Sequence, residues 1–133
     1  MKTVLIADDD EAARRLLALS LSSEQYQLLE ARDGDEAWQL ITTRRPHVVV
    51  LDVLMPKRNG FDLAYAIKND PALGGVYIIM VSALARDDHR AAATLAGADI
   101  FITKPYSPAV VRRAVERALN LGDDGEDDAG AAP

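Results

Sequence analysis

The stretch VVVLDVLMPKRNG, residues 48–60, contains the pattern from which the fold class follows. Its first four residues are aliphatic, and Asp52 comes directly after them. A short apolar run without polar alternation is typical of a strand that is buried on both faces, as in a parallel sheet. The residues from about Phe61 to Lys68 predict a helix after this stretch. This part of the chain therefore predicts a strand followed by a helix.

The same alternation of a short apolar run and a longer amphipathic stretch occurs five times along the chain. Strands are expected at residues 4–7, about 27–30, 48–51, 76–81 and 100–103. Helices are expected at residues 11–21, from about 33 to Pro46, at 61–68, at 87–96 and from 107 to near 122. This alternation predicts an α/β fold, a five-stranded doubly wound parallel sheet with helices on both faces.

Local signals set several helix ends. Asp33 and Glu36 have the spacing of a capping box, in which each side chain pairs with a backbone N–H of the first turn. Gly97 is expected as the C-cap of the fourth helix, because glycine tolerates the left-handed conformation found there. Ser107 and Pro108 are expected as the N-cap and first residue of the fifth helix.

Length and composition indicate one domain without redox chemistry. The chain has 133 residues, the usual size of one compact domain, and no cysteine, which fits a reducing cytosol. The apolar run near the start is too short for a signal peptide or a membrane span, so a cytoplasmic protein is expected. The net charge of −6, from 21 acidic and 15 basic residues, argues against direct nucleic-acid binding.

Part of the acidity lies at the end of the chain. Residues 122–133, GDDGEDDAGAAP, contain five carboxylates and three glycines and no large apolar residue. Such a segment cannot bury enough surface to order itself. The sequence therefore predicts a folded domain over residues 1–121 and a disordered acidic tail over residues 122–133.

Polar residues follow four of the predicted strands at their carboxyl ends. They are Asp8-Asp9-Asp10, Asp52, Ser82 and Lys104-Pro105. In an open parallel sheet these ends meet at one edge, where ligands bind. Carboxylates gathered in a partly desolvated crevice repel one another and need shifted pKa values or a cation. Oxygen ligands without histidine or cysteine favour Mg²⁺, with Mn²⁺ as the alternative.

Four segments resemble, in order and spacing, the signature segments of receiver domains of two-component response regulators, in particular the chemotaxis-regulator type. They are LIADDD, VVVLDVLMPKRNG, IIMVSA and GADIFITKPY, within a resemblance that covers about residues 2–120. The resemblance implies a flavodoxin-like sheet with the strand order 2-1-3-4-5. It also implies a cis peptide bond between Lys104 and Pro105.

The resemblance assigns roles to individual positions. Asp52 is implied as the phosphoryl acceptor, with Lys104 and Ser82 bonding the phosphoryl oxygens. Ser82 and Phe101 match the pair that switches conformation after phosphorylation.

The resemblance also implies a metal site. Asp9 and Asp52 are expected to bind Mg²⁺ directly and Asp8 through water. The backbone carbonyl of Leu54 is expected to supply a further ligand.

The implied function is a magnesium-dependent phosphorylation switch rather than an enzyme, because the only chemistry is self-phosphorylation and self-dephosphorylation at Asp52. The phosphoryl donor is expected to be a histidine kinase or a histidine phosphotransfer protein. A downstream effector protein is expected at the face made by the fourth helix, fifth strand and fifth helix. The resemblance leaves open a homodimer that forms on phosphorylation.

Two other functions are weighed against this one. A phosphohydrolase of the haloacid dehalogenase type needs a second aspartate two residues after the nucleophile, where this chain has Leu54. A pseudoreceiver would lack some of the chemical positions, and all of them are filled here. The apolar side chains of Leu54 and Leu84 also suggest shielding of the acyl phosphate from water, and hence a long-lived phosphoryl state.

Overall fold

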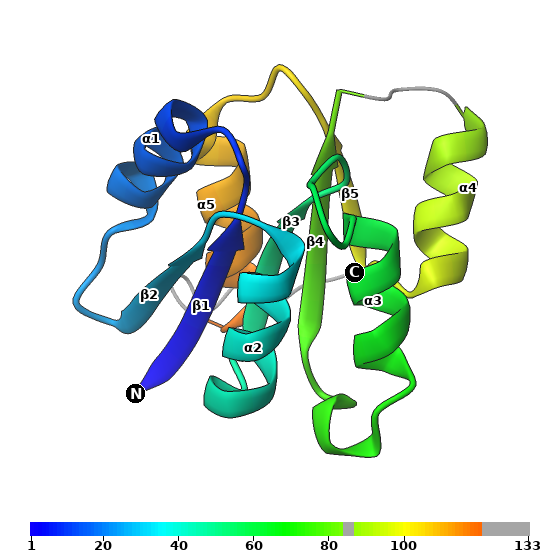
Figure 1. Cartoon of the computed structure of the whole chain (residues 1–133). Coiled ribbons are helices and arrows are strands. Elements are labelled where there is room, and N and C mark those ends of the chain that lie inside the picture. Colours follow the sequence, from blue (N-terminus) through cyan, green and yellow to red (C-terminus); the bar gives the residue numbers. More distant parts are fainter. Residues whose placement is uncertain (84–86, 121–133) are drawn as a thin grey trace.

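In the computed structural model, five parallel strands form one sheet in the order β2-β1-β3-β4-β5, as predicted (Figure 1). The structure describes residues 1–83 and 87–120, except for the side chains of Asp87 and Asp88. Leu84 and the predicted acidic tail lie outside the described residues. The strands are β1 (Lys2–Ala7), β2 (Tyr26–Ala31), β3 (Val48–Asp52), β4 (Tyr77–Ser82) and β5 (Ile100–Thr103).

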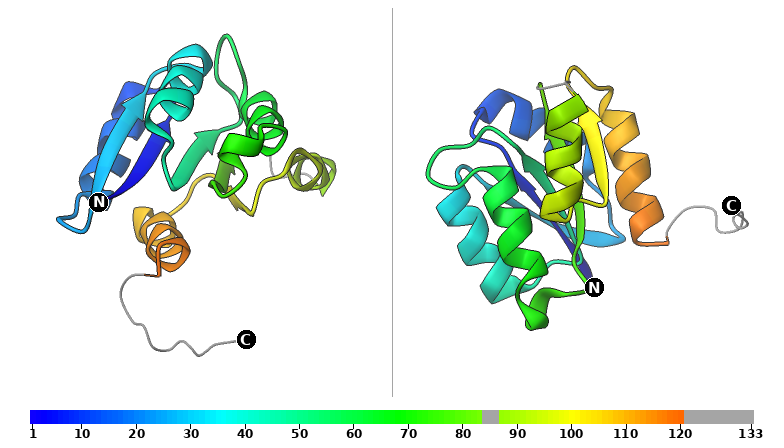
Figure 2. Two further views of the ribbon diagram at one scale, coloured as in Figure 1. Left: turned by 90° about the horizontal axis from the view of Figure 1, so that it is seen from below. Right: turned by 90° about the vertical axis from the view of Figure 1, so that its right-hand side faces the viewer.

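Helices follow each strand and cover both faces of the sheet (Figures 1 and 2). They are α1 (Glu11–Leu21), α2 (Gly34–Arg44), α3 (Gly60–Lys68), α4 (Asp87–Ala96) and α5 (Pro108–Ala118), with a 3₁₀ turn, η1 (Pro71–Leu73), before β4. One apolar cluster joins α2, α3 and α4 to the sheet, and the other joins α1 and α5 to its opposite face. Successive residues of β1 and β3 enter alternate clusters, as the period of a strand requires.

Several predicted element boundaries need correction. Asp52 and Ser82 are the last residues of β3 and β4, whereas the sequence placed them just beyond those strands, and Val76 lies before β4. Both residues are polar, so the sequence pattern indicated that each strand ends one residue earlier. In the structure both side chains are buried at the strand ends. The fifth helix ends at Ala118 rather than near residue 122, because Asn120 takes a left-handed φ of 59°.

The helix caps follow the predicted side chains, with one difference. Asp33 accepts a hydrogen bond from the Glu36 N–H at 2.8 Å. The Glu36 carboxylate accepts a hydrogen bond from the Arg32 N–H at 2.7 Å. The capping box predicted the N–H of the cap residue Asp33 as this donor. Ser107 caps α5 through the Ala109 N–H, as expected.

The residue after α4 is Gly97, as predicted, with a φ of 108°. A Cβ atom at this position would lie 2.3 Å from Cγ of Lys68, so a larger residue would also displace the Lys68 side chain of α3. None of the described helices is long and apolar enough to cross a membrane.

Candidate functional site

The candidate site lies at the carboxyl edge of β1, β3 and β5. Asp8 and Asp9 follow β1, Asp52 ends β3, and Lys104 follows β5. Neighbouring parallel strands bring these ends together, because β3 pairs with β1 on one side and with β4 on the other. The edge therefore gathers side chains that are far apart in the chain, as the sequence predicted.

Three carboxylates form the acidic part of the site. One oxygen atom each of Asp8, Asp9 and Asp52 lies within 4.8 Å of the other two. Asp8 and Asp52 are buried, with 3% and 5% of their surface exposed, and Asp9 is exposed. Of these three residues, only Asp9 is exposed to solvent.

Lys104 connects two of these carboxylates. Its Nζ atom lies 3.0 Å from Oδ2 of Asp52 and 3.4 Å from Oδ2 of Asp8. The Lys104–Pro105 peptide bond is cis, as the resemblance implied, and the Lys104 N–H donates to the Ser82 carbonyl at 2.7 Å. The lysine ammonium therefore faces the two buried acids.

The charges of these residues are strongly coupled. Burial raises the pKa of the Asp52 carboxyl from 3.8 to about 6, since the hydrogen bond from Lys104 lowers it only in part and the nearby Asp8 raises it further. Burial alone would lower the pKa of the Lys104 ammonium, but its hydrogen bond to Asp52 and the two carboxylate charges raise it. Asp52 is thus ionised at neutral pH, but its ionised form is destabilised when no cation is bound.

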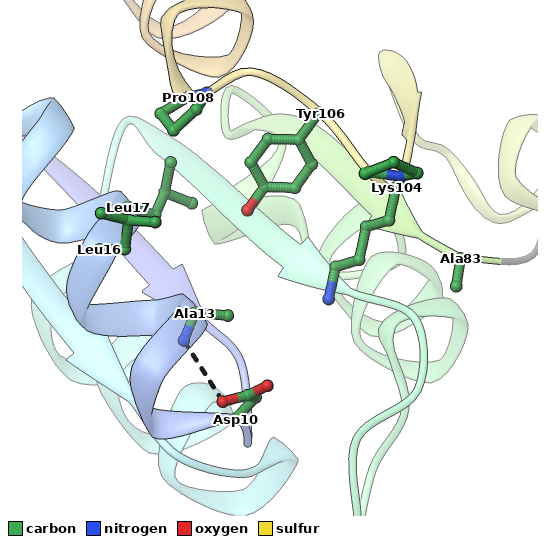
Figure 3. Close-up of a pocket in the computed structure, with 9 residues that line it drawn as sticks. Asp10, Ala13, Leu16, Leu17, Ala83, Lys104, Tyr106 and Pro108 are labelled. Carbon is green, nitrogen blue, oxygen red and sulfur yellow. Dashed lines mark hydrogen bonds between the residues drawn. The ribbon is translucent and has the colours of Figure 1, made fainter.

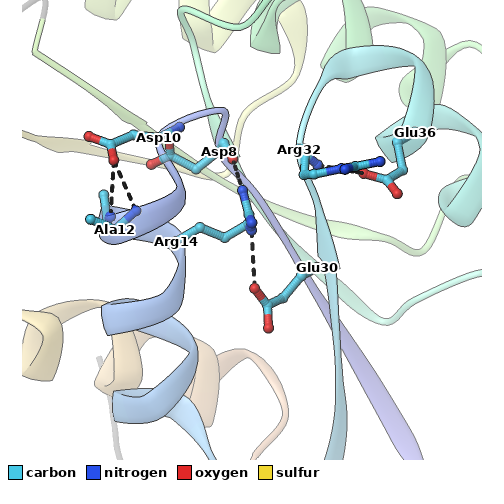
Figure 4. Close-up of polar contacts among 8 residues, drawn as sticks. Asp8, Asp10, Ala12, Arg14, Glu30, Arg32 and Glu36 are labelled. Atoms are coloured by element: carbon cyan, nitrogen blue, oxygen red, sulfur yellow. Dashed lines mark hydrogen bonds and ion pairs between the residues drawn. The ribbon is translucent and has the colours of Figure 1, made fainter.

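The loop after β1 is held by hydrogen bonds within it and by α1 (Figure 4). Asp8 Oδ1 accepts from the Asp10 N–H at 2.9 Å. The Asp10 carboxylate accepts from the N–H groups of Ala12 and Ala13 and so caps α1. Asp10 is therefore a helix cap, and of the three aspartates in this loop only Asp8 and Asp9 belong to the cluster with Asp52.

The loop after β3 is folded tightly against Asp52. The Leu54 N–H donates to Oδ1 of Asp52 at 3.2 Å, which leaves the other carboxylate oxygen facing Lys104. The Val53 carbonyl accepts from the N–H groups of Met55 and Gly60. Leu54 is 55% exposed, although its backbone N–H is held by Asp52.

Ser82 and Phe101 occupy different parts of the neighbourhood. Ser82 is fully buried at the end of β4, next to Lys104 through the backbone hydrogen bond. Phe101 is half-buried on β5 and packs against the cluster under α2, α3 and α4. The Arg90 guanidinium lies 5.1 Å from the centre of its ring and donates to Oγ1 of Thr103 at 2.6 Å. Phe101 thus contacts α4, outside the acidic cluster.

A cavity of about 440 Å³ opens beside the site, between α1 and the loop that joins β5 to α5 (Figure 3). Tyr106 lines it, together with Lys104 and the apolar side chains of Leu16 and Leu17. Burial raises the pKa of the Tyr106 hydroxyl, although the nearby Lys104 charge opposes this. Tyr106 was not predicted as a site residue from the sequence. Its position two residues after Lys104 was the only signal that placed it near the site.

Arg14 and Glu30 are two further charged residues that the sequence interpretation missed. Arg14 is buried behind the Asp8 backbone and pairs with Glu30 on β2. Its position three and seven residues before Leu17 and Leu21 places a charge on the buried face of α1. That spacing was the available signal, since an arginine on an apolar helix face requires a polar partner.

The donor atoms fit a divalent cation with oxygen ligands. The cluster offers carboxylate oxygens only, which suits Mg²⁺ better than metals that prefer sulfur or imidazole. Burial and the charge of Asp8 both raise the pKa of Asp52. A cation there would reduce the repulsion between the Asp8 and Asp52 carboxylates.

Comparisons with known proteins agree with this geometry. A sequence model of the response regulator receiver domain matches residues 4–116. The phosphate regulon transcriptional regulatory protein PhoB of Pseudomonas aeruginosa is 37% identical over 125 residues, which are 92% of this chain and 55% of PhoB. The chain spans about half the length of the curated relatives that it matches.

Solved structures give the same result for the fold. The receiver domain of the Francisella response regulator 1452 is 27% identical, with a TM-score of 0.83 over 90% of this chain and 98% of that one. The chemotaxis response regulator CheY4 of Vibrio cholerae is 26% identical, with a TM-score of 0.81 over 90% and 99%.

A doubly wound sheet with this strand order and an acidic cluster at its carboxyl edge defines a receiver module of two-component signalling. The chain belongs to the response regulator receiver domain family.

Proposed function

We propose that Asp52 accepts a phosphoryl group from a histidine kinase or a histidine phosphotransfer protein. The observation that carries this assignment is the contact of Lys104 Nζ with Oδ2 of Asp52 at 3.0 Å, inside a cluster of three carboxylates. An ionised oxygen of Asp52 attacks the phosphorus, the new O–P bond forms, and the P–N bond to the donor histidine breaks. The donor imidazole leaves, and water later hydrolyses the acyl phosphate.

The protein contributes position and charge to this transfer. Lys104 stabilises negative charge on a phosphoryl oxygen, and the Ser82 hydroxyl bonds another. Asp9, Asp52 and the Leu54 carbonyl would hold Mg²⁺, and Asp8 would hold it through water. When bound, Mg²⁺ (or Mn²⁺ in its place) neutralises charge on the transferred group.

The domain acts as a switch and not as an enzyme on a separate substrate. A phosphohydrolase would need an acid where this chain has the apolar, half-exposed Leu54. The five positions that the receiver chemistry requires are filled here by Asp8, Asp9, Asp52, Ser82 and Lys104, which disfavours a pseudoreceiver. Phosphorylation would draw Ser82 toward the phosphoryl group, and Phe101 would then turn inward and change the α4 surface that it contacts.

The partners follow from this switch. We propose that an effector protein docks on the face made by α4, β5 and α5, where Arg112, Arg113 and Arg117 are exposed. A phosphorylation-dependent homodimer would use the same face. The acidic net charge disfavours direct nucleic-acid contact by this part of the chain, although PhoB is named a transcriptional regulatory protein. Phosphotransfer from a histidine kinase would occur in the cytoplasm.

The receiver unit would end near residue 121, after α5, and residues 122–133 would be an acidic extension outside the switch. The family match over residues 4–116 supports a unit that takes up most of residues 1–121. Truncation after residue 121 is expected to leave magnesium binding and phosphorylation unchanged.

Binding of beryllofluoride, a phosphoryl mimic, tests the assignment. With Mg²⁺ present, beryllofluoride is expected to bind the wild-type protein and to give a bound signal in fluorine NMR. Asp52→Asn should abolish that signal. Equal binding by the variant would rule out Asp52 as the acceptor, and turnover of a small phosphate ester would favour the hydrolase.

A further inference from the structure

Among residues 1–83 and 87–120, Arg14 is the only buried lysine or arginine. It lies on α1, and 5% of its surface is exposed. Its Nη1 atom donates to the Asp8 carbonyl at 2.9 Å, and its Nε atom donates to Oε1 of Glu30 at 3.1 Å (Figure 4). A buried guanidinium is costly unless its donors are paired, so both contacts are needed to keep Arg14 there.

These contacts fix the first residue of the acidic loop from both sides. The Asp8 N–H donates to the carbonyl of Ala31, the last residue of β2, at 3.1 Å. The Asp8 carbonyl is held by Arg14, which is tied through Glu30 to the same strand. The two peptide groups that flank the Asp8 Cα are therefore both anchored to the end of β2.

Arg14 makes its contact with the backbone of Asp8 and not with its carboxylate. Arg14 bonds the Asp8 backbone, while the Asp8 side chain faces Lys104 and the Asp10 N–H. Arg14 can thus set the direction of the Asp8 and Asp9 side chains without occupying their oxygen atoms. Residues that orient metal ligands in this way commonly change metal affinity when they are replaced.

We propose that Arg14 is a positioning residue of the phosphorylation site, which holds the loop after β1 so that Asp8 and Asp9 are arranged for a divalent cation. Glu30 acts with it, since it holds the guanidinium against β2. This inference rests on the proposed function, because it assumes that the carboxylate cluster binds the cation used in phosphorylation.

Titration with Mn²⁺, followed by the EPR signal of the free ion and by competition with Mg²⁺, tests the proposal. Arg14→Met removes both hydrogen bonds and should raise the dissociation constant by about tenfold or more. Arg14→Lys keeps one donor and should restore part of the affinity. Glu30→Gln keeps an acceptor but loses the charge, so it should raise the constant by a smaller factor than Arg14→Met.

Arg15→Met is the matched control, because Arg15 is the exposed neighbour on the same helix and should leave Mn²⁺ binding unchanged. Urea unfolding without metal shows whether each variant is folded under the titration conditions. Wild-type affinity in folded Arg14→Met would overturn the proposal and leave Arg14 a structural residue. If Arg14→Met does not fold, wild-type affinity in both Arg14→Lys and Glu30→Gln would overturn it.

The beryllofluoride experiment separates this inference from the proposed function. Loss of the bound signal in Asp52→Asn, together with unchanged Mn²⁺ affinity in the Arg14 variants, would overturn the role of Arg14 alone. Retention of that signal in Asp52→Asn would overturn the proposed function, whatever the Arg14 variants do.

Discussion

The pKa of Asp52 is set by burial and by two neighbouring charges of opposite sign. Burial favours its neutral form, the Lys104 ammonium favours the ionised form, and Asp8 again favours the neutral form. The pKa of about 6 means that the carboxylate is available at neutral pH but is destabilised by its surroundings. A nucleophile that is ionised and poorly solvated suits transfer of a phosphoryl group in the presence of a cation.

Replacement of Asp52 by asparagine should stabilise the protein at neutral pH without magnesium. The folded pKa is raised from 3.8 to about 6, so the folded state binds more protons between these values and stability falls as the pH rises through them. Asp52→Asn removes this cost, which is at most roughly 3 kcal/mol for a shift of this size. The free energy of unfolding in urea should therefore be larger for the variant by about 1–2 kcal/mol, given the loss of the Lys104 contact.

The stability difference should shrink as the pH is lowered from about 6 toward about 4, because Asp52 of the folded wild-type protein becomes neutral in this range. Added Mg²⁺ should stabilise the wild type more than Asp52→Asn. Asp62→Asn, at an exposed position on α3, is the control and should change stability little. A variant that is less stable than the wild type at neutral pH would contradict this electrostatic description of Asp52.

Leu54 is expected to slow hydrolysis of the acyl phosphate. Its exposed side chain lies two residues after Asp52, and its N–H is bonded to that carboxylate. Leu54→Asp would place a base near the phosphoryl group, and we expect dephosphorylation to accelerate by about tenfold or more. The decay of radiolabelled protein measures the rate.

Leu54→Met should retain the wild-type rate, because it keeps an apolar side chain of similar size. Equal rates in all three proteins would show that this position does not control water access. Leu84, which was paired with Leu54 in the sequence interpretation, lies outside the described residues.

The connection between β3 and α3 shows how an element positions the site. Gly60 begins α3 and passes close to the end of β3: a Cβ atom there would lie 2.8 Å from the Asp52 carbonyl oxygen and 3.0 Å from the Val53 Cα. The close approach lets the Gly60 N–H bond the Val53 carbonyl at 2.9 Å. The glycine at the end of the VVVLDVLMPKRNG stretch thus has a packing role beyond loop formation.

Gly60→Ala should therefore destabilise the domain by about 1–3 kcal/mol, because backbone atoms must move to admit the methyl group. It should also weaken magnesium binding, since the displaced backbone carries Asp52 and Leu54. Urea unfolding and metal titration measure the two effects. Gly75→Ala is the control, because no atom lies within 4 Å of its Cβ position; similar effects in both variants would contradict the packing role.

Individual elements also show where sequence reasoning succeeds and where it stops. The helices at residues 11–21 and 87–96 and the strand at residues 100–103 have the predicted bounds. Leu16 and Leu19 lie on α1 but outside its buried face, and they are 59% and 75% exposed. Leucine has a high helix propensity at any position, so its presence could not distinguish the core face from the surface.

At the scale of the whole molecule, the two apolar clusters explain why the fold class was predictable. The central strands β1 and β3 are buried on both faces, so their sequences are continuous apolar runs. Their carboxyl ends then carry the acids, so position predicted that Asp8, Asp9, Asp10 and Asp52 lie at one edge, and the family resemblance supplied their individual roles.

The rest of the site depends on tertiary contacts that leave little trace in the sequence. Glu30 on β2 pairs with Arg14 on α1, Tyr106 lines a cavity against α1, and Arg90 lies over the ring of Phe101. Each contact joins residues from different elements whose relative orientation only the folded structure gives. Spacing along one helix or strand could predict the faces involved but not the partners.

The whole domain operates as a switch only if the phosphoryl group forms on Asp52. The decisive measurement is intact-mass analysis after incubation with acetyl phosphate and Mg²⁺, followed by mapping of the labelled peptide. We predict the addition of one phosphoryl group, located on Asp52, that is absent without Mg²⁺ and in Asp52→Asn. Labelling of the same extent in Asp52→Asn, or a label mapped to another residue, would contradict the assignment.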